Sequence, residues 1–406
     1  QLAGFCNYWS PLIRHTDCIG GQDRILAKIP LLRLLEVLGR VMGQAKSRGT
    51  KEERVHEALD RRKEAERDVA ERRRAVGQKI AEFNKLYQTK VCLAPHENHE
   101  GPIVSAHTLS LEAFLRPISR EGRVYAIRQS ISNDRTKFPL SLELQGLREV
   151  SVFNGFCRTH DRDLFACIET RPFELSPDQL FMLAYRAVVR ESYFKRKQHE
   201  SFPSLEQIAA MHGIKEELQL TELAEQYLSA ILDGASEIET LKRKLDNLLI
   251  AKDWGRIVSR ALIFPGPPSV VASFAVQPSA DLNGNRLQDM SDRDVELSHV
   301  MVSIIPLKAG SAAIFSWLDT ANNAPLRFFD SLAQSGAPTK AVIHAALDLS
   351  ENVALSPEWY ESLAPLTKKY VMSRILNLSQ DEIYAVRGNP LARSPDLGDW
   401  GKPTNF

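Results

Sequence analysis

A cluster of cysteine and histidine residues carries the side chains best suited to chemistry in this sequence. The segment "VCLAPHENHEGPIVSAHTLS" contains Cys92 followed by His96 and His99, and "NGFCRTHDRDLF", much later in the chain, contains Cys157 and His160. Thiolate and imidazole are the ligands of tetrahedral zinc, and two short-spaced pairs brought together by the fold make a closed structural site. The sequence therefore predicts a structural zinc ion bound by Cys92, Cys157, His160 and one of His96 or His99.

The order of these motifs resembles the HNH, or ββα-metal, nuclease family, in which a strand histidine lies between two zinc-ligand pairs and the second pair opens a helix. The segment "IVSAH" ends in His107, and Asp161 directly follows the second pair. The resemblance implies a treble-clef zinc fold with His107 as the general base. It also implies that Asp161 holds a catalytic Mg²⁺ or Mn²⁺ in place of the family's metal-binding histidine, since oxygen ligands suit both ions, and that Asn154 takes the part of the family's asparagine. The function that it predicts is metal-dependent cleavage of DNA or RNA phosphodiesters.

Several features leave alternatives to a nuclease open. The first pair is Cys/His rather than Cys/Cys, no proline follows His107 in "AHTLS", and Asn154 stands only three residues before Cys157. One alternative is a non-catalytic zinc module that recognises nucleic acid or a protein partner, and another is a purely structural or assembly role. His107 itself has three candidate roles: general base, zinc ligand in place of His96 or His99, or structural histidine.

The charge pattern offers two candidate contacts for nucleic acid. The formal net charge is only +1, so any affinity for nucleic acid must be local. Residues 50–87 predict a long charged helix with the basic triplets 61–63 and 72–74, which reads as a solvated arm or as a nucleic-acid contact. Arg186 and Arg190 in "LAYRAVVRE" predict either a packed, salt-bridged face or a phosphate contact.

Composition and cysteine usage favour a cytoplasmic protein without a membrane span. Hydrophobic residues make up 43% of the 406 residues and charged residues 25%, which is ordinary for a globular chain. Five scattered cysteines do not suggest a disulfide framework. We find no apolar run of about 18 residues, the length that a transmembrane helix needs.

The chain predicts an α+β protein, with a zinc-bound treble-clef (HNH-like) region, flanking helices, a small antiparallel sheet and C-terminal helices. The segment "MGQAKSRGT" at Met42 resembles the start of a group of bacterial proteins that begin MGQAK-x-RGT, so the residues before it are either upstream, non-native sequence or a short helical segment. Four β-rich runs between residues 256 and 318, separated by Pro/Gly clusters, predict the sheet. Isolated histidines such as His344 are interpreted as exposed or satisfied locally rather than as catalytic. The predicted segments are 1–41 (upstream), 42–88 (charged helical arm), 89–175 (zinc-binding region), 176–253 (helical region) and 254–406 (sheet and C-terminal helices).

Overall fold

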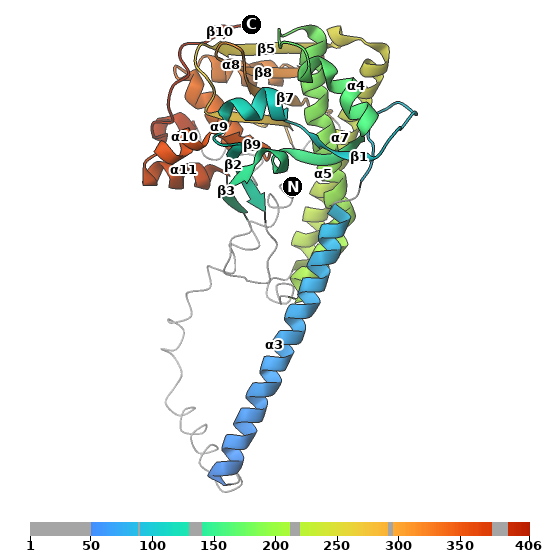
Figure 1. The fold of residues 1–406 in the computed structure, drawn as a ribbon, viewed down its shortest axis with the longest axis vertical. Coiled ribbons are helices and arrows are strands. Elements are labelled where there is room, and N and C mark those ends of the chain that lie inside the picture. Colours follow the sequence, from blue (N-terminus) through green and yellow to red (C-terminus); the bar gives the residue numbers. More distant parts are fainter. Residues whose placement is uncertain (1–49, 88–89, 130–139, 212–219, 291–294, 376–388) are drawn as a thin grey trace.

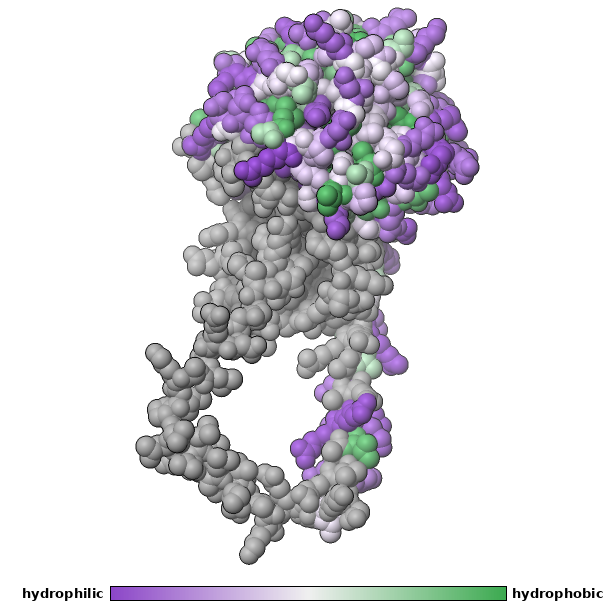
Figure 2. Space-filling view, turned by 90° about the vertical axis from the view of Figure 1, so that its left-hand side faces the viewer, coloured by the Kyte–Doolittle hydropathy of each residue, from purple (hydrophilic) through white to green (hydrophobic). Residues whose placement is uncertain are grey.

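A computed structural model describes residues 50–87, 90–129, 140–211, 220–290, 295–375 and 389–406 (Figure 1). The predicted upstream segment 1–41 and the candidate start at Met42 lie outside these residues. Within the described ranges, every helix is too short or too polar to cross a membrane. Figure 2 shows a face of the folded body that is mainly hydrophilic, with small scattered apolar areas.

The centre of the molecule is an eight-stranded sheet in which all neighbouring strands are antiparallel. This confirms the predicted mixture of helices and antiparallel sheet, and the four β-rich runs become β5, β6, β7 and β8. In spatial order the strands are β10 (Thr404–Asn405), β5 (Ile257–Phe264), β8 (Ser311–Leu318), β7 (Val300–Pro306), β6 (Val270–Val276), β9 (Val353–Leu355), β2 (Arg123–Gln129) and β3 (Leu140–Gly146).

The central strands are apolar on both faces because helices cover both faces of the sheet. Consecutive residues alternate between two cores: Ala312 and Ile314 belong to one, and Ala313 and Phe315 to the other. The first core also contains α5 (Pro177–Met211) and α7 (Leu220–Ala251). The second is covered by α8 (Ala324–Ala333), α9 (Pro338–Leu349), α10 (Pro357–Ser362) and α11 (Pro365–Ile375) (Figure 1).

The predicted charged arm is α3 (Lys51–Tyr87), which runs beside α5 and then extends away from the folded body (Figure 1). It starts with a reciprocal cap, in which the Thr50 backbone N–H donates to Glu53 Oε2 (2.7 Å) and the Glu53 N–H donates to Thr50 Oγ1 (3.2 Å). Arg61 pairs with Glu57 one turn away at 2.9 Å, with both side chains exposed. These features agree with a solvated helix.

A smaller ββα unit packs at the same side of the sheet as α5. β1 (Ile103–His107) pairs antiparallel with β4 (Val152–Cys157), which leads directly into α4 (Arg158–Glu169). The segment between β1 and β4 supplies β2 and β3 to the large sheet. Strands from the predicted segments 89–175 and 254–406 therefore belong to the same eight-stranded sheet. The short helical turns are η5 (Leu111–Leu115), η6 (Arg116–Ile118), η7 (Leu147–Glu149), η8 (Trp254–Arg256) and η9 (Pro390–Arg393).

Candidate metal centre

Backbone hydrogen bonds bring the first cysteine next to the second ligand pair. The N–H groups of Val91 and Leu93, on either side of Cys92, donate to the carbonyls of Asn154 and Gly155 in β4, at 3.1 and 2.9 Å. The segment around Cys92 therefore lies along β4 like an additional short strand. β4 ends only two residues further on, at the second cysteine, so the thiols at the two places become neighbours.

The second pair lies where β4 turns into α4. Cys157 is the residue that caps this helix, with extended backbone angles (φ −74°, ψ 161°), and His160 lies in its first turn. A C-x2-H spacing at this junction turns both side chains toward the same point.

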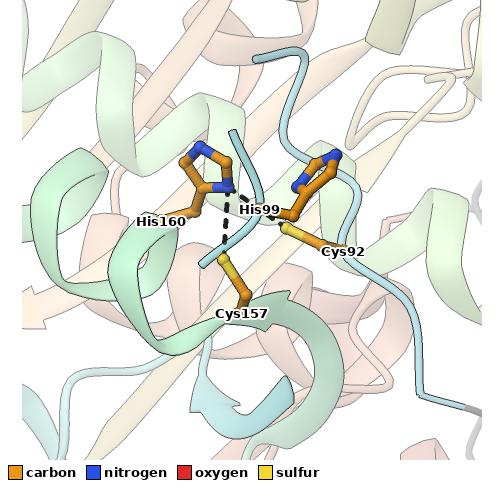
Figure 3. A group of neighbouring side chains, drawn as sticks. All are labelled: Cys92, His99, Cys157 and His160. Atoms are coloured by element: carbon orange, nitrogen blue, oxygen red, sulfur yellow. Dashed lines mark hydrogen bonds between the residues drawn. The ribbon is translucent and has the colours of Figure 1, made fainter. Parts of the chain in front are cut away.

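Four side chains converge on one point: Cys92, His99, Cys157 and His160, with their ligand atoms all within 4.8 Å of one another (Figure 3). His160 Nδ1 lies 3.3 Å from Cys157 Sγ and 3.4 Å from Cys92 Sγ. Tetrahedral zinc with Zn–S of about 2.3 Å and Zn–N of about 2.0 Å places sulfur and nitrogen ligands roughly 3.5 Å apart. The four residues can therefore hold a metal ion, and their donor set suits structural zinc.

Burial prepares the ligands for a metal and closes one side of the site. Cys157 and His160 are buried (1% and 7% exposed), Cys92 is half-buried, and His99 is exposed. Burial lowers the pKa of His160, with further lowering by the nearby His99, and so favours the neutral imidazole that binds metal. Burial raises the pKa of the Cys92 thiol, so metal binding must displace its proton.

The structure distinguishes among the candidates for the fourth ligand. The rings of His99 and His160 meet edge to face with centroids 5.1 Å apart, whereas the His96 ring is 6.0 Å away and tilted, and His96 is outside the four-residue group. His107 is also outside it, and its Nε2 lies 3.3 Å from the carbonyl oxygen of Leu147 instead. His99 is therefore the fourth ligand that this geometry favours.

His107 and Asp161 lie on adjoining parts of the ββα unit, around one buried arginine. Burial lowers the pKa of the half-buried His107, and the charge of Arg186 adds to this effect. Burial raises the pKa of Asp161, although Arg186 opposes the shift. Arg186 Nη2 is 3.9 Å from Asp161 Oδ1, a buried oxygen that makes no hydrogen bond. Among the described residues, only the Cys92 group brings three or more Cys, His, Asp or Glu ligand atoms close enough to share an ion.

Asn154 has a bridging position in β4. Its side-chain Oδ1 accepts a hydrogen bond from Ser105 Oγ in β1 (3.3 Å), and its backbone carbonyl accepts the Val91 N–H. Asn154 thus connects β1, β4 and the segment that carries Cys92. A structural contribution to the zinc site follows directly from these bonds.

The predicted phosphate contacts, Arg186 and Arg190, have buried side chains (3% and 5% exposed). Arg186 donates to Glu169 Oε1 at 2.5 Å, and Arg190 donates to Glu191 at 2.7 Å. These contacts correspond to the packed, salt-bridged face, which is one of the two interpretations of Arg186 and Arg190 from the sequence.

Glu169, at the end of α4, is a residue that motif spacing does not reveal. Besides binding Arg186, it accepts a hydrogen bond from Ser110 Oγ (2.6 Å), three residues after His107. The Arg186 guanidinium also lies over the Phe165 ring, 4.0 Å from its centroid. These contacts fix the residues after β1 against α4 and α5. No pattern in the sequence marks Glu169, because its partners are distant along the chain.

Comparisons of the chain with models of protein families, with curated proteins and with solved structures give no match. A function for this chain must therefore be inferred from the geometry of the ββα unit.

Proposed function

We propose that the ββα unit is a zinc-stabilised, HNH-like nuclease site that cleaves DNA or RNA phosphodiesters with a divalent metal ion. Its support is the order of the parts: a knuckle with Cys92, a strand that ends in His107, and a strand-to-helix junction with Cys157 and His160. The same order defines the treble clef of that family. The zinc ion in this proposal is structural, and the chemistry belongs to residues beside it.

The observation that carries the proposal is the state and position of His107. Its lowered pKa keeps the imidazole neutral at pH 7, as a general base requires. If Nε2–H donates to the Leu147 carbonyl, the tautomer is fixed and the lone pair of Nδ1 can accept a proton from water.

Asp161 is the residue proposed to hold Mg²⁺ or Mn²⁺, with Asn154 supporting the strand beside it. The carboxylate of Asp161 lies in the first turn of α4, and one of its oxygens has no hydrogen bond. A divalent ion bound there would supply charge stabilisation for the phosphodiester transition state. The neighbouring guanidinium of Arg186 disfavours a second cation, so binding of the ion is expected to be weak and to require millimolar metal.

The test is cleavage of supercoiled plasmid and of single-stranded RNA by the zinc-loaded full chain in Mg²⁺ or Mn²⁺. His107→Ala should lose about 10²- to 10⁴-fold in rate while it keeps its zinc and its melting temperature. Asp161→Asn should lose activity that higher metal concentrations partly restore. His96→Ala is the matched control and should cleave like the parent. The proposal is refuted if the protein cleaves neither the plasmid nor the RNA with any divalent ion.

A non-catalytic zinc module that binds nucleic acid or a protein is the second candidate. This candidate is favoured by the contacts of Arg186 with Glu169 and Asp161. The positive charge of the guanidinium already neutralises the carboxylates where a catalytic metal ion would bind. The exposed basic residues of α3, such as Arg61 and Lys63, would then be the place to seek nucleic-acid contacts. Salt-sensitive binding of nucleic acid without cleavage, weakened by Arg61→Ala, would support this candidate.

A further inference from the structure

A second group of polar side chains lies far from the zinc ligands, among the helices that cover the other face of the sheet. His344 and Asp348 are one turn apart in α9, Tyr370 belongs to α11, and Ser394 directly follows η9. Figure 1 shows α9 and α11 on the side of the sheet away from α5. The side chains of His344 and Asp348 have no exposed surface, and Ser394 is half-buried.

The three residues Ser394, His344 and Asp348 follow one another in space as nucleophile, base and carboxylate. His344 Nε2 lies 3.1 Å from Ser394 Oγ, within hydrogen-bond reach. The other ring nitrogen, Nδ1, lies 3.6 Å from Asp348 Oδ2. Without substrate, such contacts are often longer than in the reacting complex. The i, i+4 spacing in α9 holds both His344 and Asp348 on one helix face.

The carboxylate of Asp348 is fixed in place by an arginine. Arg374 Nε donates to Asp348 Oδ1 at 2.5 Å, and its Nη2 donates to Oδ2. A two-point contact of this kind sets the plane of the carboxylate. His344 Nδ1 is a buried nitrogen without a hydrogen bond. A proton on Nδ1 would face the carboxylate, and it would leave the Nε2 lone pair directed at Ser394.

Tyr370 adds a hydrogen-bond donor beside the same atoms. Its hydroxyl lies 3.4 Å from His344 Nε2. Burial raises the pKa of Tyr370, so the hydroxyl stays protonated at neutral pH. Ser394 Oγ is also 3.0 Å from the carbonyl of Pro395, and its single proton can turn from there to His344. A serine hydroxyl, an imidazole and a neutral phenol thus meet at one half-buried point.

We propose that Ser394, His344 and Asp348 form a nucleophilic site that accepts acyl groups from carboxylic esters. Ser394 Oγ attacks the carbonyl carbon while its proton passes to His344 Nε2, and Asp348 stabilises the resulting imidazolium. The C–O bond to the alcohol then breaks, and His344 returns the proton to the leaving oxygen. Water hydrolyses the acyl-serine in the same way, with His344 as base, and restores the hydroxyl. Tyr370 donates to the developing oxyanion. This site is independent of the zinc ligands and of the proposed nuclease.

The test is covalent labelling of the full-length protein with a fluorophosphonate, in which Ser394 Oγ displaces fluoride from phosphorus. Peptide mass spectrometry should place the adduct on Ser394, and Ser394→Ala should abolish it. His344→Gln should slow labelling by about 10²- to 10⁴-fold, and the same variants should lose hydrolysis of p-nitrophenyl acetate. Ser362→Ala is the matched control, because this exposed serine donates only to the Trp359 carbonyl and should not affect labelling.

Circular dichroism and melting curves show whether each variant is folded. His344 is buried, and His344→Gln can therefore fail to fold. In that case Tyr370→Phe takes its place as the test, because it keeps the aromatic ring. This variant should be labelled more slowly than the parent. The proposal is wrong if the folded parent protein is not labelled at Ser394, or if Ser394 reacts no faster than Ser362. The polar group would then serve only to hold the segment after η9 against α9 and α11.

Discussion

Replacement of Cys157 by alanine should release the zinc ion and unfold the ββα unit. Cys157 is 1% exposed and lies at the turn from β4 into α4, so its removal opens the site from its buried side. Structural zinc contributes on the order of 10 kcal/mol in small zinc-bound units, and whole domains are stable by only about 5–15 kcal/mol. Even a loss of about 4 kcal/mol should lower the melting temperature by roughly 10 °C.

The effect should extend beyond the ligands because the ββα unit shares its core with the rest of the protein. Phe156 of β4 and Phe165 of α4 are fully buried, with ring centroids 5.1 Å apart, and both belong to the core that contains α5. Without the metal, the Nδ1 atom of the buried His160 would keep the two cysteine thiols as its polar neighbours in the site. Loss of the metal should therefore also make the unfolding of the rest of the folded body less cooperative, which the melting curve reports.

The assay is zinc content by mass spectrometry together with melting curves before and after a strong chelator. His99→Ala should also weaken zinc binding, but after chelation it should melt like the chelated parent, because His99 is exposed. His96→Ala is the matched control and should retain one zinc ion per chain. The reasoning fails if the purified parent lacks stoichiometric zinc, if Cys157→Ala melts like the parent, or if His96→Ala loses zinc as readily as His99→Ala.

Two further predictions concern buried charges. Arg186→Met should destabilise the protein by about 3–5 kcal/mol in urea unfolding, because it leaves Glu169 and Asp161 without their cation. The exposed pair of Arg116 with Glu112 is the control, and Arg116→Met should leave the urea midpoint nearly unchanged, because solvent screens an exposed ion pair. Equal effects of the two substitutions would contradict this. Burial lowers the pKa of the half-buried His299, beside a cavity of about 120 Å³, from 6.5 to about 4. The unfolded chain therefore takes up the proton first, so stability should fall by up to about 3 kcal/mol as pH drops from 6.5 to 4. His299→Gln should flatten this part of the curve of melting temperature against pH, and an unchanged slope would count against the assignment.

Much of the sheet could be predicted from the sequence, because apolar runs bounded by Pro and Gly clusters identify β5 to β8. The alternation that normally tells which face is buried is missing there, since both faces pack against helices. The three residues of β9 are too few to form a pattern, yet they join β6 to β2. That short strand brings strands from segments 89–175 and 254–406 together in one sheet.

The group of Cys and His residues that could hold a metal ion could be predicted from residue types and spacing, but the choice between His96 and His99 could not. Both are histidines on the same turn, and only the path of the chain between Cys92 and β1 selects one of them. The partners of Arg186 and His344 depend on how helices pack, so no local pattern reveals them. His344 is interpreted from sequence as exposed or satisfied locally, whereas it is fully buried and its hydrogen-bonding neighbours belong to α11 and the segment after η9.

The insert between β1 and β4 makes the position of His107 depend on the large sheet. The chain returns from β3 to β4 through Leu147, whose carbonyl is the hydrogen-bond partner of His107. The two ends of the insert are closed by the Thr108 N–H, which donates to the Ser151 carbonyl at 2.8 Å, and by the Leu109 N–H, which donates to Ser151 Oγ at 2.9 Å. The Cys/His group that could hold a metal ion lies at one end of the ββα unit, and the pairing of β2 with β3 and β9 holds the other. The proposed nuclease depends on this restraint, because a general base needs a fixed orientation, whereas a metal knuckle with a purely structural role would not need it.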